Sequence, residues 1–107
     1  MKSFKIHLTK NAEKDLIRLK NLMNEALDKI MVLKQDPYAG HLLKGSMRGV
    51  RSLDFSINGT AYRAAYVLMK DEKVCLVFMI GPHEGFYEKA ERKAKSLKKH
   101  KGFHTAR

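Results

Sequence analysis

The stretch Val74-Cys-Leu-Val-Phe-Met-Ile-Gly-Pro-His-Glu-Gly-Phe-Tyr87 joins an apolar segment to a basic C-terminal region. Its nearly all-apolar part, 74–80, predicts a strand covered on both faces, which we expect to be the central strand of a sheet. The Gly/Pro loop that follows separates this strand from a helix expected over 84–99. Loops at such junctions commonly carry reactive side chains. This one holds His83, Glu84 and Tyr87.

Two further strands precede this segment and are expected to form a hairpin. Residues 50–56 alternate weakly between apolar and polar, and residues 60–69 form a longer strand-like run. Between them, Asn58-Gly59 is a strong signal for a two-residue hairpin turn. The polar run 70–73 then turns the chain into the strand that begins at Val74.

The N-terminal part predicts one strand and two helices. Residues 3–8 alternate apolar and polar as in a half-buried strand, and Thr9 can cap the helix that follows. Asn21 interrupts the helical pattern, and a second helix is expected over 23–33. It should end before Asp36-Pro37, because proline disfavours the helical conformation of the residue ahead of it. The two helices predict an αα-hairpin, and residues 37–49 a loop.

The expected order is therefore β-α-α-β-β-β-α in a single domain, 1–107, of the α+β class. We expect a small, mostly antiparallel, four-stranded sheet with the N-terminal helical hairpin on one face and a C-terminal helix. Residues 102–107 are expected to form a flexible tail.

The charge indicates a polyanionic partner. The 107 residues contain 22 Lys and Arg against 11 Asp and Glu, a formal net charge of +11. Such an excess is typical of proteins that bind RNA, DNA, an anionic membrane or an acidic protein. The single cysteine, Cys75, fits a reducing compartment, and no apolar run reaches the roughly 20 residues of a membrane span. Because charged residues also recur near the N-terminus, we expect a cytoplasmic protein without a signal peptide.

Three stretches carry a resemblance to a known family. Phe4-Lys-Ile-His-Leu-Thr-Lys-Asn-Ala-Glu-Lys-Asp-Leu16 resembles its first strand and helix, and Gly59-Thr-Ala-Tyr-Arg-Ala-Ala-Tyr66 its tyrosine–arginine strand. Ile80-Gly-Pro-His-Glu-Gly-Phe-Tyr-Glu-Lys-Ala90 resembles its C-terminal signature. In this order and at this length, the chain resembles the RelE/ParE superfamily of bacterial toxins from type II toxin–antitoxin systems.

The resemblance implies a ribosome-associated endoribonuclease that cleaves mRNA without a metal and is neutralised by a cognate antitoxin in a hetero-oligomer. It carries over three residues to the active site. These are Arg63 on the strand, His83 after the last strand and Tyr87 in the following helix.

The chemistry of RNA cleavage gives each of these residues a possible role. Attack by the 2′-hydroxyl needs a base, an acid for the leaving 5′ oxygen, and cations for the charged phosphorane. Arg63 can bind phosphate oxygens, or it can simply pair with an acid. His83 can act as acid or base, and Tyr87 can stack on a base or orient a phosphate. Alternatively, His83 is incidental and Tyr87 packs the helix on the sheet. Glu84 is expected to cap the helix.

Asp54 is where the sequence departs from the family's pattern. If Leu53 and Phe55 point into the core, Ser52 and Asp54 face the cleft. The best-known ribonucleases of the family place lysines at such strand positions. Asp54 could itself be the general base, could pair with Arg63, or could mark incomplete cleavage machinery.

Two groups of cations are candidates for RNA-backbone binding. The first occupies the glycine-rich approach to the hairpin and the second the basic C-terminal helix, and in both a solvated surface is the alternative. The same helix could instead attract an acidic antitoxin segment that mimics RNA charge. The candidates are Lys44, Arg48 and Arg51 in the first group and Lys89, Arg92 and Lys93 in the second.

The sequence has neither metal-ligand spacing nor a nucleotide-binding glycine loop, so we expect no metal and no cofactor. Two functions remain open besides the nuclease. One is a ParE-like toxin that inhibits DNA gyrase without cutting nucleic acid, and the other is a plain nucleic-acid-binding module.

Overall fold

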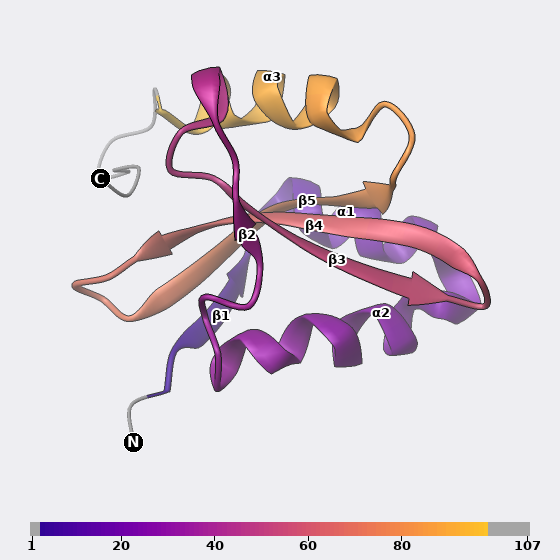
Figure 1. Ribbon diagram of the computed structural model, residues 1–107. Coiled ribbons are helices and arrows are strands. Elements are labelled where there is room, and N and C mark those ends of the chain that lie inside the picture. The colour runs from indigo at the N-terminus through magenta and orange to yellow at the C-terminus, as the bar shows by residue number, and fades with distance from the viewer. Residues whose placement is uncertain (1–2, 99–107) are drawn as a thin grey trace.

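The computed structural model describes residues 3–98 and contains a five-stranded sheet in the order β1-β5-β4-β3-β2 (Figure 1). Strand β1 pairs with β5 in parallel, and the remaining neighbours are antiparallel. The mostly antiparallel α+β fold is therefore confirmed. The strands are β1 (Lys5–Leu8), β2 (His41–Leu42), β3 (Arg51–Ile57), β4 (Thr60–Met69) and β5 (Val74–Pro82).

The sheet differs from the expectation in two respects. It has a fifth strand, β2, inside the segment 37–49 that was expected to be loop, because His41 and Leu42 pair with β3. The central strand is β4, whereas β5 lies between β4 and β1. Strand β5 is nonetheless buried along almost its whole length, so its apolar run was interpreted correctly as an interior strand.

Helices cover both faces of the sheet. One apolar cluster joins α1 (Lys10–Arg18) and α2 (Met23–Ile30) to one face, through residues such as Leu16, Ile30 and Tyr66. A second cluster joins α3 (Phe86–Lys98) to the other face, through Phe78 and Phe86. Figure 1 shows α3 on one side of the sheet and α2 on the other. Side chains therefore alternate between two buried layers along β4 and β5.

Local signals account for most of the boundaries. Thr9 caps α1, since its Oγ1 accepts a hydrogen bond from the Ala12 amide at 3.1 Å. Asn58 and Gly59 both have positive φ, 53° and 80°, as a two-residue hairpin of type I′ requires. A 3₁₀ turn over Met31–Lys34 follows α2 and ends the hairpin before Asp36-Pro37. The predicted cap, turn and helix end are thus confirmed.

The start of α3 corrects one expectation. The helix begins at Phe86 rather than Glu84, and Gly85 before it has φ 66°, a left-handed conformation that interrupts a helix. Glu84 therefore lies outside the helix, exposed in the preceding turn. The predicted tail, 102–107, lies outside the described residues. Within residues 3–98, no helix is both long and apolar enough to cross a membrane.

Candidate functional site

The site is built around a cross-strand pair. Asp54 on β3 lies directly opposite Arg63 on β4, and Arg63 Nε lies 3.6 Å from Asp54 Oδ1. Tyr62 and Ala64 belong to the α1–α2 layer, so Arg63 points to the α3 side as its strand position predicts. The Arg63 side chain is only 13% exposed, whereas that of Asp54 is 48% exposed. A largely buried guanidinium thus meets a carboxylate open to solvent.

Tyr87 covers this pair from α3. Its hydroxyl accepts a hydrogen bond from Arg63 Nη1, and the Arg63 guanidinium carbon lies 4.6 Å from the ring centroid. Tyr87 as a residue is 40% exposed, so it remains partly open to solvent. Arg63 and Tyr87 were predicted separately on a strand and a helix, and the fold brings them into contact.

His41 joins the same cluster and was missed in the sequence. Its Nδ1 lies 3.9 Å from Asp54 Oδ2, and its Nε2 lies 3.4 Å from the Tyr87 hydroxyl. Pairing of His41 with Ser52 places it there, since Ser52 is two residues from Asp54 on β3. A two-residue strand has no periodicity to detect. The available signal was a histidine beside a glycine in the segment 37–49, which leads to the strand predicted over 50–56.

His83 reaches the pair from the loop after β5. It lines a pocket of about 200 Å³ together with Asp54 and Arg63, at the end of the β3–β4 hairpin. The His83 amide donates to the Ala61 carbonyl at 3.1 Å, which fixes the loop against β4. The fold therefore gathers Asp54, Arg63, Tyr87 and His83 around one location, and adds His41.

Ser52 is not open to the cleft as expected. It lies on the same sheet face as Asp54, but its side chain is fully buried. Its hydroxyl donates to Asp54 Oδ1 at 3.0 Å, which leaves Oδ2 turned toward His41. Ser52 thus orients the carboxylate instead of facing a ligand.

A buried tyrosine positions the segment that carries His41. The Tyr66 hydroxyl donates to the Pro37 carbonyl at 2.8 Å and accepts from the Gly40 amide at 2.9 Å. Burial raises the pKa of Tyr66 to about 12. A Cβ at Gly40 would lie 2.8 Å from the Tyr66 ring and from the Ser52 carbonyl oxygen. Only glycine allows β2 to approach β3 this closely.

The predicted RNA-contacting cations separate into two kinds. Arg51 donates from Nη1 to the Gly40 carbonyl at 2.6 Å and stacks on Tyr38, with 4.8 Å between guanidinium carbon and ring centroid. Lys93 donates to Asn11 Oδ1 at 2.5 Å. The side chains of Arg51 and Lys93 are thus engaged in hydrogen bonds within the protein. The other four candidate cations are exposed, namely Lys44, Arg48, Lys89 and Arg92.

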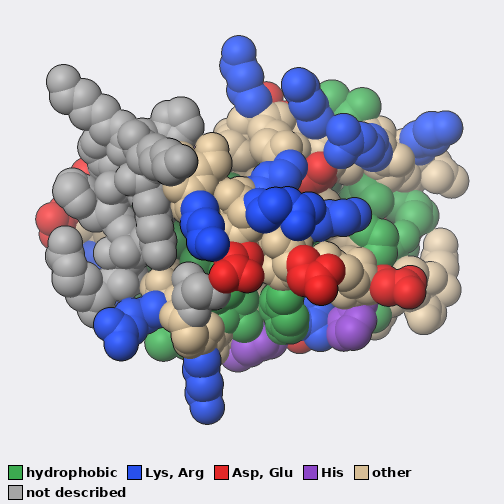
Figure 2. All heavy atoms as spheres, turned by 90° about the horizontal axis from the view of Figure 1, so that it is seen from above, with side chains coloured by type: hydrophobic (Ala, Val, Ile, Leu, Met, Phe, Trp, Pro, Cys, Tyr) green, Lys and Arg blue, Asp and Glu red, His purple; other side chains and the backbone are tan. Residues whose placement is uncertain are grey.

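The surface over α3 carries much of the charge. Figure 2 shows Lys and Arg side chains spread across this face, with Asp and Glu side chains gathered between them. The candidate site combines the imidazoles of two histidines with a carboxylate, a guanidinium and a phenol. They belong to His41, His83, Asp54, Arg63 and Tyr87. These groups can bind a phosphate and transfer protons on both sides of it without a further group.

Comparisons with known proteins identify the fold and the family. The family model for the ParE-like toxin of type II bacterial toxin–antitoxin systems matches residues 6–91. No curated protein gives a significant match. A free mutant of the E. coli toxin RelE is similar at a TM-score of 0.68 and 17% identity, over 89% of this chain and 98% of that one.

Two toxin–antitoxin complexes contain similar chains. A chain of the intact E. coli RelBE complex matches at a TM-score of 0.62 and 20% identity, over 77% of this chain and 99% of that one. A chain of the RelBE2 complex from Mycobacterium tuberculosis matches at 0.64 and 19%, over 76% and 99%. The family match spans β1 through the first turns of α3 and so includes the whole candidate site. The chain therefore belongs to the RelE/ParE superfamily, as a ParE-like toxin of a type II bacterial toxin–antitoxin system.

Proposed function

We propose that this toxin is a metal-independent, ribosome-dependent mRNA endoribonuclease that inhibits translation. The observation that carries the proposal is the contact of Asp54 with both Arg63 and His41, beneath Tyr87 and beside the pocket of His83. If the Asp54–Arg63 pair only stabilised the fold, it would not require two histidines and a partly exposed tyrosine beside it.

The proposed reaction is attack of an RNA 2′-hydroxyl on the adjacent phosphorus. His41 takes the 2′ proton, the oxygen–phosphorus bond forms, and the bond to the 5′ oxygen breaks as His83 protonates that oxygen. The products are a 2′,3′-cyclic phosphate and a 5′-hydroxyl. Arg63 stabilises the charge on the phosphorane. Asp54 contacts Nδ1 of His41, the position from which a carboxylate orients an imidazole base.

Tyr87 is proposed to hold a nucleotide against Arg63. Its ring lies against the guanidinium and is open in part, so a base can stack on it while Arg63 binds the phosphate. The exposed cations of the α3 face and the glycine-rich segment would bind RNA backbone. Cleavage would depend on the ribosome because the ribosome holds the mRNA in the orientation that attack by the 2′-hydroxyl requires.

The partner is proposed to be a cognate antitoxin, with which the toxin forms a hetero-oligomer in the cytoplasm. The similar E. coli RelE has been solved with its antitoxin RelB. Antitoxins neutralise the toxins of type II systems, so the same relation is proposed for this chain.

A second candidate function is inhibition of DNA gyrase without nuclease activity. The matching family model is that of ParE-like toxins, which favours this candidate. Asp54, at a position where the best-known ribonucleases of the superfamily carry lysine, favours it as well.

Expression of the toxin in a bacterium, followed by mapping of mRNA 5′ ends on ribosomes, tests the proposal. The wild-type chain should produce codon-phased cuts, and His41→Ala and Arg63→Lys should each reduce cutting at least about 100-fold, the usual cost of losing one such group. His7→Ala, an exposed histidine on β1, is the matched control and should cut normally. Growth arrest with intact mRNA and blocked supercoiling would instead establish the gyrase inhibitor.

A further inference from the structure

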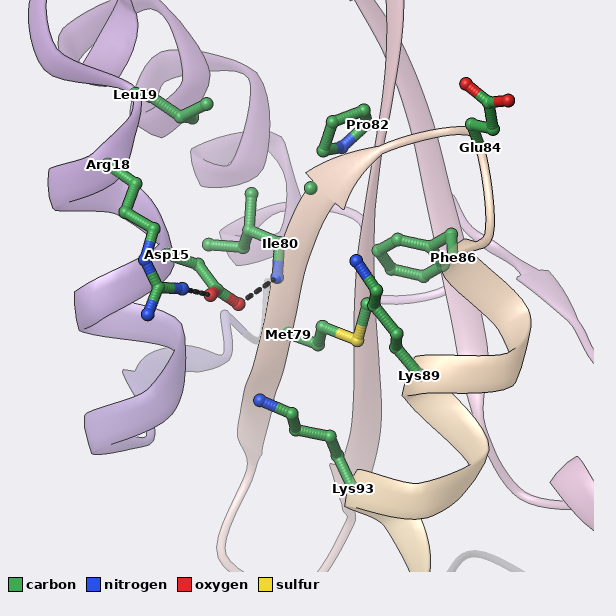
Figure 3. Close-up of a pocket in the computed structure, with 11 residues that line it drawn as sticks. Asp15, Arg18, Leu19, Met79, Ile80, Pro82, Glu84, Phe86, Lys89 and Lys93 are labelled. Carbon is green, nitrogen blue, oxygen red and sulfur yellow. Dashed lines mark hydrogen bonds and ion pairs between the residues drawn. The ribbon is translucent and has the colours of Figure 1, made fainter.

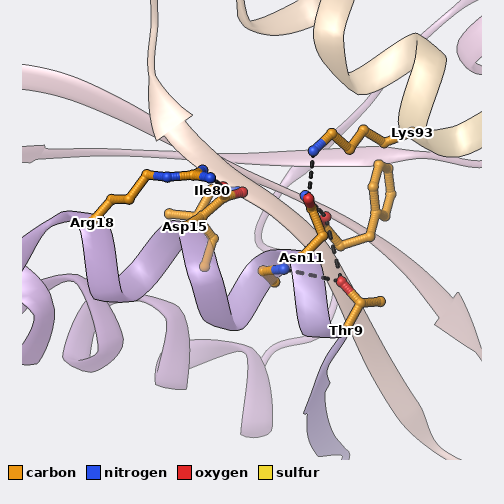
Figure 4. A network of polar contacts seen from close by, with 8 residues as sticks. Thr9, Asn11, Asp15, Arg18, Ile80 and Lys93 are labelled. Carbon is orange, nitrogen blue, oxygen red and sulfur yellow. Dashed lines mark hydrogen bonds and ion pairs between the residues drawn. The ribbon is translucent and has the colours of Figure 1, made fainter.

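Two hollows between α1 and α3 contain side chains that already serve the fold. In the first, of about 270 Å³, Asp15 Oδ2 accepts a hydrogen bond from the Ile80 amide at 2.9 Å (Figure 3). In the second, of about 620 Å³, Asn11 Nδ2 donates to the Phe78 carbonyl at 3.2 Å and its Oδ1 accepts from Lys93 (Figure 4). Strand β1 is shorter than β5, so these side chains of α1 cover the edge of β5 that β1 leaves free.

A third hollow, of about 200 Å³, lies on the hairpin of β3 and β4 beside the Asp54–Arg63 pair. The next pair toward the turn on the same sheet face is Ser56 opposite Ala61, because side chains two residues apart share a face. Ser56 and Ala61 both line the hollow, and both are exposed. Two small side chains therefore leave open space next to the residues of the proposed reaction.

The hollow has room for one nucleobase. Pockets for drug-sized ligands usually exceed about 300 Å³. This hollow measures about 200 Å³, so a single ring system fits it better than a whole nucleotide. The rings of Phe55 and Tyr62 stack on each other, with 6.0 Å between their centroids, and pack in the α1–α2 layer. A base in the hollow would therefore lie against Ser56 and Ala61 and be recognised at its edge.

The exposed carboxylate of Asp54 can discriminate among bases. The Asp54 side chain is 48% exposed and lines the hollow, and the groups that contact its Oδ1 are Ser52 and Arg63. A carboxylate accepts hydrogen bonds and donates none. Adenine, guanine and cytosine each present an amino group to such an acceptor, whereas uracil presents carbonyl oxygens on both sides of its one N–H. An amino-bearing base therefore matches this edge of the hollow better than uracil does.

The two histidines of the candidate site give the direction of the RNA. His83 lines the hollow. His41 pairs opposite Ser52, two residues before Asp54, whereas the hollow continues two residues after it, at Ser56. In the proposed reaction, His41 takes the 2′ proton of the nucleotide before the cut, and His83 protonates the 5′ oxygen of the nucleotide after it. A base in the hollow therefore belongs to the nucleotide after the cut.

We propose that this hollow binds the base of the nucleotide on the 3′ side of the cut and accepts adenine, guanine or cytosine in preference to uracil. The proposal rests on the nuclease function proposed above and extends it from the phosphate to the base sequence. Ser56 and Ala61 set the size of the hollow, and Asp54 selects the base. Ser56 and Ala61 take no part in the proposed reaction, so substitutions there change the hollow alone.

Binding of uncleavable dinucleotides tests the hollow directly. A 2′-O-methyl group on the first nucleotide blocks cleavage, and the second base is varied among the four. NMR titration of the isotope-labelled full-length toxin gives the affinity, and the amide signals of Ser56 and Ala61 report where the base lies. Uracil as the second base should bind at least about fivefold more weakly than the other three. Asp54→Asn should narrow this difference, because an amide both donates and accepts hydrogen bonds.

Ala61→Leu fills the hollow from an exposed position and should weaken binding of amino-bearing second bases at least about tenfold. Thr60→Leu is the matched control. Thr60 is also exposed, but it faces the other side of the sheet and does not line the hollow, so this variant should bind like the wild type. Equal affinity for all four second bases, or unchanged binding by Ala61→Leu, would overturn the base pocket.

Mapping of mRNA 5′ ends on ribosomes connects the hollow to cleavage. Relative to ribosome occupancy, uracil should be under-represented as the first nucleotide after the cut. Ala61→Leu should lower the share of cuts before purines, which need more space than pyrimidines, and Thr60→Leu should not. An unchanged share of purines in Ala61→Leu would contradict the base pocket and leave the nuclease standing. Conversely, base-dependent dinucleotide binding without any cuts in cells would overturn the nuclease and leave the base pocket in place.

Discussion

Asp54 connects the parts of the candidate site at the scale of single residues. Ser52 holds one carboxylate oxygen and His41 approaches the other, while Arg63 pairs with the same group across the strands. The sequence left open whether Asp54 is the general base, pairs with Arg63 or marks incomplete cleavage machinery. The structure shows the contact with Arg63. In the proposed reaction the base is therefore His41, with Asp54 as the carboxylate that contacts its Nδ1.

Tyr66→Phe tests whether the buried tyrosine holds the β2 segment in place. The change removes one hydroxyl and leaves the Gly40 amide and the Pro37 carbonyl without their bond. Loss of buried partners of this kind costs about 1–3 kcal/mol of unfolding free energy. Urea unfolding measures the loss. Tyr38→Phe, on a half-exposed ring, should change the stability by less than about 0.5 kcal/mol.

The same variant should alter the dependence of stability on alkaline pH. Burial raises the pKa of Tyr66 from 10.0 to about 12, so its neutral phenol stabilises the fold below pH 10 and this contribution disappears as the pH rises through 12. Burial also raises the pKa of Cys75 from 9.0 to about 11, with the same sign. Urea unfolding between pH 9 and 12 should show a shallower decline for Tyr66→Phe than for the wild type. Equal slopes would contradict the role of Tyr66.

Strand β2 is decisive at the scale of elements, although it has only two residues. It pairs with β3, and its approach depends on Gly40 and on the side chains of Tyr66 and Arg51. Pairing of β2 with β3 places His41 next to Asp54 in the candidate site. Its position is thus fixed by residues distant in the sequence.

Gly40→Ala should damage this element and the site together. The new methyl group would lie 2.8 Å from the Tyr66 ring and a backbone oxygen, so β2 must shift, at a cost of about 1–3 kcal/mol. RNA cleavage should fall with it, because His41 moves away from Asp54. Gly81→Ala is the control, since its methyl group would meet its nearest side-chain atom at 4.0 Å. Thermal unfolding and 5′-end mapping measure the two effects, and a stable, inactive Gly40→Ala protein would contradict the coupling between them.

The elements that the sequence predicted correctly are those with a local cause. The cap at Thr9, the Asn58-Gly59 turn and the apolar run of β5 each act over a few neighbouring residues. Strand β2 could not be predicted, because its pairing depends on Tyr66, 26 residues beyond Gly40. The start of α3 was misplaced because the left-handed conformation of Gly85 cannot be read from a glycine alone. For the candidate site, the sequence named Asp54, Arg63, His83 and Tyr87, which the fold brings together, but it did not name His41 on β2.

The whole molecule presents a strongly positive surface to its partners. The net charge of +11 belongs to the chain as a whole, and its exposed cations include Lys44 and Arg48 ahead of β3 and Lys89 and Arg92 on α3. Such a charge attracts RNA and acidic proteins alike over long range, so under the proposed function RNA and the antitoxin would compete for the toxin through electrostatics.

Binding of a short single-stranded RNA should therefore weaken steeply with salt. If about three to five phosphates are neutralised, affinity falls roughly 20- to 100-fold between 50 and 200 mM salt. Lys89→Ala should lower the slope of log affinity against log salt by about 0.7, the share of one phosphate. Lys29→Ala, on α2, should leave the slope unchanged. Fluorescence anisotropy gives these slopes, and a salt-independent affinity would argue against a phosphate-based interface.

The covering of the β5 edge also affects how the toxin behaves when it is made in excess of its antitoxin. An uncovered strand edge recruits other strands and leads to aggregation. Asn11 binds the Phe78 carbonyl and Asp15 the Ile80 amide, so neither backbone group is free to pair with another strand. We expect substitutions at these positions to cause turbidity in concentrated samples, and a genetic screen for lost toxicity would score them together with changes in the candidate site, although that site is untouched.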